Sequence, residues 1–253
     1  MTAKIARKRL DLLLLECGLA ESRQKAQAMI LAGEVMVEGQ RADKAGLAVA
    51  ETAKIEVNSR LQKYASRGGF KLEGALEDFR IDVHGKICLD VGSSTGGFTD
   101  CLLQNGAARV YAVDVNTGQL AWKLQEDPRV IRIEKNARAL AAADIAEAAQ
   151  IVVMDVSFIS VSKVLPGAVE CANAGADLLI LIKPQFELER GDVGKGGIVR
   201  ETELHEKAIA KVRKVAGELG LNCVGVAPSR LAGAEGNQEY FLHARKAGTV
   251  ESL

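Results

Sequence analysis

The sequence predicts an α/β protein with two parts, a small α+β module and a larger, doubly wound sheet of mostly parallel strands. The first observation is a change in the length and order of the predicted strands and helices along the chain. Segments before residue 62 are short, whereas apolar strand segments alternate with helices from residue 67 onward. That alternation is typical of a parallel sheet with helices on both faces. The second observation is size, because 253 residues, 48% of them hydrophobic, suffice for one large core and a small extra domain.

Residues 1–62 are predicted to form a compact module of two helices followed by short strands. A first helix is expected over 9–17, and a second begins after Ser22, whose hydroxyl can accept hydrogen bonds from the first helical turn. Gly33 is expected to end the second helix. The stretches EVMVEG and KIEVN predict short strands, and residues 63–67 are expected to link this module to a second domain at 68–253.

The second domain is predicted to begin with a helix, GFKLEGALEDF, that leads into its first strand. Further helices are expected from Thr117, in the Ala-rich stretch after the third strand, after Ser160, and over residues 201–219. The last two strands are joined by a loop without helical periodicity, so they are expected to pair antiparallel. The strands are predicted in GKICLDVG, ARVYAVDV, RVIRIEK, IVVMDVSF, LLILIKP, LNCVGVAPS and EYFLHARKAG.

Charge is unevenly distributed, although the formal net charge is zero. Residues 1–66 contain 11 Lys and Arg against 8 Asp and Glu, and the remainder contains 22 against 25. The positive excess in the front module indicates a polyanion as its partner, and a mixed solvated surface explains it equally well. Aromatic residues make up only 4% of the chain, so stacking of bases on exposed rings is not an expected theme.

Cysteine, histidine and apolar runs exclude several classes of protein. The five cysteines form no CxxC pair and the three histidines lack metal-ligand spacing, so we expect reduced, packed thiols, no bound metal and a cytoplasmic protein. The apolar run near the N-terminus covers only Leu12–Leu15, too short for the core of a signal peptide. No stretch reaches the ~18 apolar residues of a membrane span, so no membrane association is expected.

The segment LDVGSSTGGFTD, residues 89–100, is predicted to be a strand, a glycine-rich turn and a helix start. Its spacing is neither GxGxxG nor a P-loop, which disfavours dinucleotides and ATP. Asp114 ends the next strand, where a carboxylate can accept hydrogen bonds from both ribose hydroxyls of a nucleoside. A purely structural turn with a solvated Asp is the alternative. The expected ligand is S-adenosylmethionine, held by Asp90, Gly92, Ser93, Ser94, Thr95, Gly96, Gly97, Asp114 and Asp155.

Asp155 and Lys183 each end a buried strand, in IVVMD and LLILIK. Ligands of a doubly wound sheet bind outside the carboxyl ends of its strands, so both side chains are expected near the glycine-rich turn. A lysine beside a carboxylate in a partly dry crevice can serve as a general base. A simple ion pair at the strand ends, or a lysine that extends to solvent, is the structural alternative.

The residues next to Asp155 and Lys183 limit which chemical group can be expected to accept a methyl group from S-adenosylmethionine. The DVSF that begins at Asp155 is not the Pro-Pro-aromatic run of amino-group methylases, which disfavours methylation of base amines. No cysteine adjoins Asp155 or Lys183, which argues against carbon-5 methylation of pyrimidines, because that reaction needs a thiol nucleophile. A hydroxyl acceptor remains, and the ribose 2′-OH is the natural candidate.

Six motifs in order resemble those of a known family. RLDLLLLECGLAESRQKAQAMILAGEVMVEG is similar to the small RNA-binding domain shared by ribosomal protein S-four and tyrosyl-tRNA synthetase. SRGGFKLEGAL, LDVGSSTGGFTD, DVSFIS, LIKPQFE and GNQEYF resemble the motifs of the TlyA family of ribosomal-RNA methyltransferases, also described as haemolysins. The resemblance covers nearly all of the chain. It implies an S-four-like RNA-binding domain followed by a Rossmann-like, FtsJ-like methyltransferase domain that uses S-adenosylmethionine.

The same resemblance implies a catalytic tetrad of Lys71, Asp155, Lys183 and Glu239. Lys183 would act on the ribose 2′-OH as base or orienting group, Asp155 and Glu239 would hold the two lysines, and Lys71 would position the acceptor. The implied substrate is cytidine in 16S rRNA, 23S rRNA or both, within assembled ribosomal subunits. The resemblance also places Asn136, in the NAR stretch after the third strand, near the cofactor. The nearby carboxylates Glu73 and Glu187 are expected to be structural or solvated.

Arg9 and Arg23 fall at the starts of adjacent predicted helices, where guanidinium groups can reach the phosphates of rRNA, and Lys8 and Lys25 are expected to assist. Solvated charges at helix ends are the alternative. Two other functions stay open. One is a non-catalytic rRNA-binding assembly factor that retains the fold. The other is a haemolysin, which is disfavoured because the apolar segments are only strand-length. The oligomeric state is not predicted.

Overall fold

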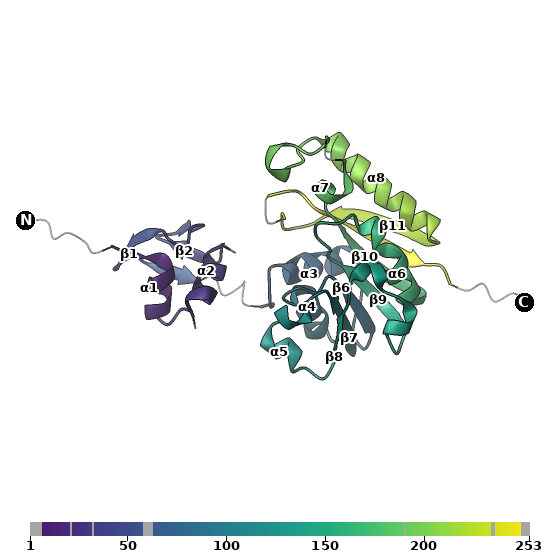
Figure 1. Ribbon diagram of the computed structural model, residues 1–253, viewed down its shortest axis with the longest axis horizontal. Coiled ribbons are helices and arrows are strands. Elements are labelled where there is room, and N and C mark those ends of the chain that lie inside the picture. The colour runs from purple at the N-terminus through teal and green to yellow at the C-terminus, as the bar shows by residue number, and fades with distance from the viewer. Residues whose placement is uncertain are drawn as a thin grey trace, which may run out of the picture. The chain divides into compact units, whose positions relative to one another are not determined.

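The computed structural model describes residues 7–20, 22–31, 33–57, 63–189, 191–233 and 236–248. The chain forms two compact units, Met1–Lys63 and Tyr64–Leu253 (Figure 1). The division lies near the predicted linker 63–67, but Tyr64 to Arg67 belong to the second unit. Tyr64 is buried and its hydroxyl donates to Glu73 Oε1 at 2.9 Å, while the Ala65 amide donates to Asp100 Oδ2 at 2.7 Å.

The first unit packs two helices against short strands. Leu10, Leu14 and Ile30 are fully buried in its core, and Ser22 Oγ accepts from the Lys25 amide at 3.1 Å, which confirms the predicted cap. Gly33 has φ of 72°, a left-handed conformation that ends the second helix as expected. Residues 7–9 form a strand, so the first helix begins later than predicted. The elements are β1 (Arg7–Arg9), α1 (Leu10–Glu16), α2 (Arg23–Leu31), β2 (Val35–Val37), β3 (Gln40–Arg41), β4 (Ala48–Ala50) and β5 (Ile55–Val57).

The second unit confirms the doubly wound α/β architecture. Its seven-stranded sheet has the order β11-β12-β10-β9-β6-β7-β8. Strands β10 to β8 in that order are parallel, and β12 pairs antiparallel with both β10 and β11, as predicted for the last two strands. The strands are β6 (Ile87–Val91), β7 (Arg109–Asp114), β8 (Val130–Glu134), β9 (Ala149–Met154), β10 (Ala172–Ile182), β11 (Leu221–Pro228) and β12 (Tyr240–Lys246).

Helices cover both faces of this sheet (Figure 1). Leu165 and Val212, from α6 and α8, pack into the core on one face, whereas Leu72 and Leu102, from α3 and α4, pack into the core on the other. The α-helices are α3 (Gly68–Phe79), α4 (Gly97–Gln104), α5 (Trp122–Gln125), α6 (Leu165–Cys171), α7 (Pro184–Glu187) and α8 (Thr202–Glu218). Short 3-10 turns are η2 (Thr117–Gln119), η3 (Ala137–Ala139), η4 (Ala142–Asp144), η5 (Val161–Lys163) and η6 (Lys195–Gly197).

The Ala-rich stretch after β8 is not the helix that its composition predicts. It contains only the two 3-10 turns η3 and η4. Asn136 Oδ1 accepts from the Arg138 amide at 3.0 Å, and Asp144 Oδ2 accepts from the Ala141 amide at 2.8 Å. These local side-chain bonds to the backbone compete with the helical ladder and outweigh the propensity of alanine.

Candidate active site at the carboxyl ends of the strands

The glycine-rich turn between β6 and α4 is built for close packing. Gly92 and Gly96 have φ of 90° and 93°, which favours glycine at both positions. A Cβ on Gly92 would lie 2.4 Å from the Asp155 carbonyl oxygen, so this loop can adjoin the end of β9 only with glycine there. Gly96 packs instead against Leu120 and Leu124. The leucines leave no room for a side chain at position 96, and Gly96 does not line either of the two cavities that adjoin this turn.

Asp114 is held at the end of β7 by two backbone bonds. Its Oδ2 accepts from the Ser94 amide at 3.0 Å and its Oδ1 accepts from the Asn116 amide at 3.1 Å. Beside it lies a cavity of about 580 Å³. Five residues predicted to hold the cofactor line this cavity: Gly92, Ser94, Asp114, Asn136 and Asp155. The tertiary structure thus places four separate loops, after β6, β7, β8 and β9, around one space.

A second cavity of about 240 Å³ adjoins the same turn. Gly92, Ser94 and Asp155 line both cavities, so the two spaces share a wall. The predicted cofactor residues Ser93, Thr95 and Gly97 line this second cavity, together with the predicted catalytic residues Lys71 and Lys183. The glycine-rich turn therefore borders both the cavity beside Asp114 and the cavity that contains the two lysines.

Asp90 lies beneath the turn and not on its surface. Its side chain is fully buried, and Thr99 Oγ1 donates to its Oδ2 at 2.6 Å. Burial raises the pKa of the Asp90 carboxyl to about 7, against the opposing effect of the Thr99 hydrogen bond. Asp90 therefore acts on the turn through Thr99 and does not line either of the two cavities, which differs from the predicted direct contact.

The raised pKa of Asp90 makes stability depend on pH. Between the ordinary pKa of 3.8 and about 7, the folded state binds this proton more tightly than the unfolded state, so stability falls as pH rises through this window. Asp90→Asn removes the titration, so the stability of the variant relative to the wild type should rise as pH increases from 4 to 7, by up to about 1.4 kcal/mol for each pH unit, and should level off above pH 7. Thermal unfolding of variant and wild type across this pH range checks the prediction, with Asp82→Asn, at an exposed position, as the control. A stability difference between Asp90→Asn and the wild type that does not change with pH would contradict the prediction.

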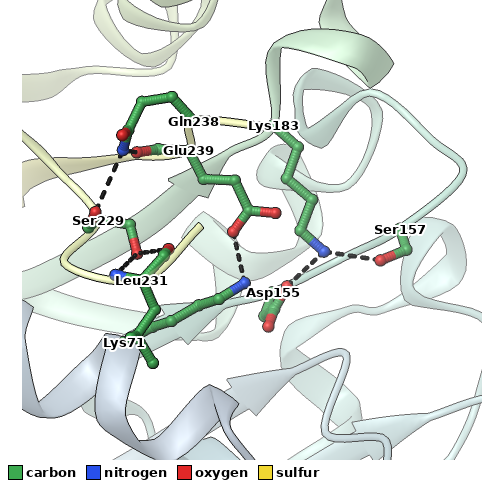
Figure 2. A network of polar contacts seen from close by, with 8 residues as sticks. All are labelled: Lys71, Asp155, Ser157, Lys183, Ser229, Leu231, Gln238 and Glu239. Atoms are coloured by element: carbon green, nitrogen blue, oxygen red, sulfur yellow. Dashed lines mark hydrogen bonds and ion pairs between the residues drawn. The ribbon is translucent and has the colours of Figure 1, made fainter. Parts of the chain in front are cut away.

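The four predicted tetrad residues form two ion pairs (Figure 2). Lys183, at the end of β10, has its Nζ 2.6 Å from Asp155 Oδ1, and it donates to Ser157 Oγ at 2.7 Å. Lys71, on α3, has its Nζ 2.5 Å from Glu239 Oε2, just before β12. The Lys71 and Glu239 side chains are 11% and 3% exposed. Charges this deeply placed require their partners, because an unpaired buried charge is costly.

Sequence reasoning missed Ser157 and Phe158, which follow Asp155. The Phe158 side chain is 91% exposed, and its backbone has φ of 63°, a strained conformation for a bulky residue. Its ring centroid lies 5.4 Å from that of Phe186. Phe158 lines the 580 Å³ cavity and also a third cavity, of about 260 Å³, that contains Lys183 and Glu239. The low aromatic content concealed this exposed ring, although its place three residues after the catalytic candidate Asp155 was a usable signal.

Glu187 explains how the Phe158 loop is held. Its carboxylate is buried, with Oε2 accepting from Ser160 Oγ at 2.5 Å and Oε1 accepting from the Val161 amide at 2.7 Å. Lys211 Nζ lies 3.4 Å from Oε2. Since Glu187 belongs to α7, directly after Lys183, it connects the loop of Asp155 to the strand end that carries the lysine. The predicted structural role fits this position, and solvation does not.

The predicted RNA-binding residues lie in the first unit. Arg9 ends β1 and Arg23 begins α2, and both guanidinium groups bond to the buried carboxylate of Asp11. Lys8 Nζ pairs with Glu16 at 2.5 Å, and Lys25 is exposed in the first turn of α2. Arg9 is both the last residue of β1 and the N-cap of α1, so Arg9 and Arg23 lie at the starts of adjacent helices, as predicted.

Comparisons with known proteins match both units. The profile of the FtsJ-like methyltransferase family matches residues 64–246, and that of the S4 domain matches residues 8–55. The chain is 48% identical to the 16S/23S rRNA (cytidine-2′-O)-methyltransferase TlyA of Mycobacterium tuberculosis, over 94% of this chain and 90% of that protein. It is 46% identical to Hemolysin A of Brachyspira hyodysenteriae, over 89% of this chain and 95% of that protein.

A solved structure from Streptococcus thermophilus, described as a hemolysin, is 38% identical, with a TM-score of 0.76 over 98% of this chain and 93% of that chain. Within the ranges that the structure describes, every helix is too short or too polar to cross a membrane. The described residues also contain no group of three or more His, Cys, Asp or Glu side chains that could hold a metal ion.

Proposed function

The chain belongs to the TlyA family of FtsJ-like methyltransferases with an amino-terminal S4 domain, and on this basis we propose that it methylates the ribose 2′-OH of cytidine in ribosomal RNA. The methyl donor is S-adenosylmethionine, and the substrates are the 16S and 23S rRNAs within ribosomal subunits in the cytoplasm. The observation that carries the proposal is the pair of buried lysine–carboxylate contacts beside the glycine-rich turn.

The 580 Å³ cavity is lined by a hydrogen-bond acceptor and apolar side chains that suit a nucleoside without a phosphate. Each oxygen of Asp114 accepts one backbone bond, and a carboxylate oxygen can accept another, which leaves capacity for ribose hydroxyls. The carboxylate would repel a phosphate at the same place. Val113, Val156 and Ile159 supply apolar walls suited to an adenine ring. Bound there, S-adenosylmethionine supplies an electrophilic methyl group on its sulfonium.

The tetrad supplies the groups for the acceptor. Lys183 Nζ, fixed by Asp155 and Ser157, would orient the ribose hydroxyl and, after losing its own proton to solvent, would take the hydroxyl proton as a neutral amine. As the 2′-oxygen attacks the methyl carbon in line, the new O–C bond forms and the S–C bond breaks. Lys71, held by Glu239, lines the same cavity and would position the ribose. Positioning of this kind supplies much of the acceleration in a displacement reaction.

Methyl transfer from labelled S-adenosylmethionine to purified ribosomal subunits tests the proposal. The RNA is then hydrolysed with alkali, which does not cleave next to a 2′-O-methyl ribose. Label in alkali-resistant dinucleotides that contain cytidine is the expected result, and its distribution between 16S and 23S rRNA defines the substrates. Label in mononucleotides would mean base methylation. No label, despite binding of the cofactor, would favour the non-catalytic rRNA-binding alternative.

Phe158 is expected to stack on the base of the target nucleotide. An exposed ring between the cofactor cavity and the Lys183–Glu239 cavity can support a base that has left its helix. Phe158→Ala should lower the single-turnover rate by about 10- to 100-fold, since base–aromatic stacking is worth roughly 1–3 kcal/mol. S-adenosylmethionine binding, measured by calorimetry, should change little. Phe158→Tyr is the control and should retain the rate, and equal losses in both variants would contradict stacking.

A further inference from the structure

Asp11 is a fully buried carboxylate at the start of α1 that gathers side chains from three places in the first unit. Arg9 Nε donates to its Oδ1 and Arg9 Nη2 to its Oδ2, both at 2.9 Å. Arg23 Nε donates to Oδ2 at 3.0 Å, and Gln27 Nε2 donates to Oδ2 at 2.9 Å. One carboxylate therefore joins the end of β1 to the first two turns of α2 through four hydrogen bonds.

The carboxylate of Asp11 is charged in this arrangement. The hydrogen bonds from Arg9 hold its pKa well below the usual range, against the opposing effect of burial, and the bonds from Gln27 and Arg23 act in the same direction. Two guanidinium groups against one carboxylate leave a net charge of one positive unit. The three groups thus form a stable cationic cluster and not a neutral pair.

Both guanidinium groups remain accessible to a further ligand. The side chains of Arg9 and Arg23 are 47% and 52% exposed, whereas Asp11 is completely covered. A guanidinium has five N–H donors, and the bonds to Asp11 use two of those of Arg9 and one of those of Arg23. The remaining donors belong to two planar groups that a shared carboxylate holds close together. Phosphate, with several acceptor oxygens and a negative charge, matches such a pair.

We propose that Asp11 is a positioning residue that holds Arg9 and Arg23 as one preformed pair, and that this pair grips a backbone phosphate of ribosomal RNA. The inference rests on the proposed function for the identity of the RNA. Preorganisation is the advantage, because two long side chains need not be ordered when the RNA binds. Lys8 is different, since its amine is engaged by the exposed Glu16 at the surface.

The substitution Asp11→Asn distinguishes positioning of the arginines from a simple effect of charge, because the two explanations predict opposite changes in RNA affinity. Asp11→Asn removes a negative charge from an RNA-binding surface, which by general electrostatics should tighten binding. If Asp11 positions the arginines, the same substitution should weaken binding by about tenfold, because both side chains must then be ordered on binding. Asp43→Asn makes the same change of charge at an exposed position of the same unit and is the matched control. It should bind RNA at least as tightly as the wild type.

Filter binding compares the affinities of the wild type, Asp11→Asn and Asp43→Asn for purified ribosomal subunits. The full chain is used, without S-adenosylmethionine, over a series of salt concentrations. Weaker binding and a shallower salt dependence for Asp11→Asn, with neither change in Asp43→Asn, is the expected result. Affinity equal to or above the wild type in Asp11→Asn would overturn the proposal. Because this assay measures binding only, a failure of methyl transfer in all variants would count against the proposed reaction and not against the arginine pair.

A second variant keeps the proposal testable if Asp11→Asn unfolds the first unit, as circular dichroism would reveal. Arg9→Lys combined with Arg23→Lys preserves every charge but replaces the planar, multidentate groups with point charges. The paired-guanidinium proposal predicts about tenfold weaker binding for this double variant. Wild-type affinity in the double variant would show that charge suffices and would overturn the proposal.

Discussion

Lys183→Ala is expected to lower methyl transfer by about 100- to 10,000-fold, the range typical of losing a group that moves a proton in the transition state. The Lys183 amine is held at 2.6 Å from Asp155 and 2.7 Å from Ser157, so its position is defined before any RNA arrives. Asp155 is partly exposed and can be solvated when the lysine is absent, so the fold should tolerate the change. Single-turnover rates on ribosomal subunits with saturating S-adenosylmethionine measure the effect.

The control for this prediction is Lys214→Ala on α8. Its amine lies 3.9 Å from Glu218 in an exposed pair, which should contribute little to stability or rate. Ser157→Ala should give an intermediate loss, because Lys183 keeps Asp155 but loses its second partner. If Lys183→Ala retains most of the wild-type rate while it binds the cofactor normally, another residue must accept the proton of the 2′-OH.

Glu239→Ala is expected to destabilise the second unit by about 3–5 kcal/mol, the usual cost of leaving one partner of a buried ion pair alone. Lys71 would remain with its side chain largely buried and its amine without the carboxylate at 2.5 Å. Hydrogen exchange of the amides in β10 and β12 measures this stability in the second unit by itself. Methyl transfer should fall as well, through the loss of Lys71 positioning.

A double substitution separates the two effects. Lys71→Met with Glu239→Gln removes both charges and should recover most of the lost stability, because no unpaired buried charge remains. Methyl transfer should stay low in the double variant, since neither replacement can restore a positioned amine. The exposed Lys214–Glu218 pair, treated in the same way, provides the reference for a pair without a functional position. Recovery of the rate together with stability would mean that the buried pair is only structural.

The strands and helices that patterning predicts well are those with long apolar periodicity. The parallel strands, the antiparallel last pair and the Ser22 cap are all present. The Ala-rich stretch after β8 shows the limit of this reasoning. Its propensity is helical, but Asn136 and Asp144 bond to nearby backbone amides and leave only 3-10 turns. Local competition of this kind depends on geometry that composition does not record.

The amino-acid sequence by itself determined which chemical groups the protein carries and at which strand ends they lie. Asp114, Asp155 and Lys183 could be placed at one edge of the sheet because parallel strands bring their carboxyl ends together. The glycine-rich turn could be identified because few other residues allow such a close approach of backbone. These inferences need only short-range patterns and the general rules of α/β topology.

Only the tertiary structure decided which groups meet. Lys71 and Glu239 are separated by 168 positions and yet form a 2.5 Å pair, because α3 and the start of β12 lie beside the same strand ends. The buried Asp11 joins Arg9 to Arg23, and Glu187 fixes the loop that exposes Phe158. Such contacts depend on packing between distant segments, which sets burial and partners but leaves no periodic signal in the sequence.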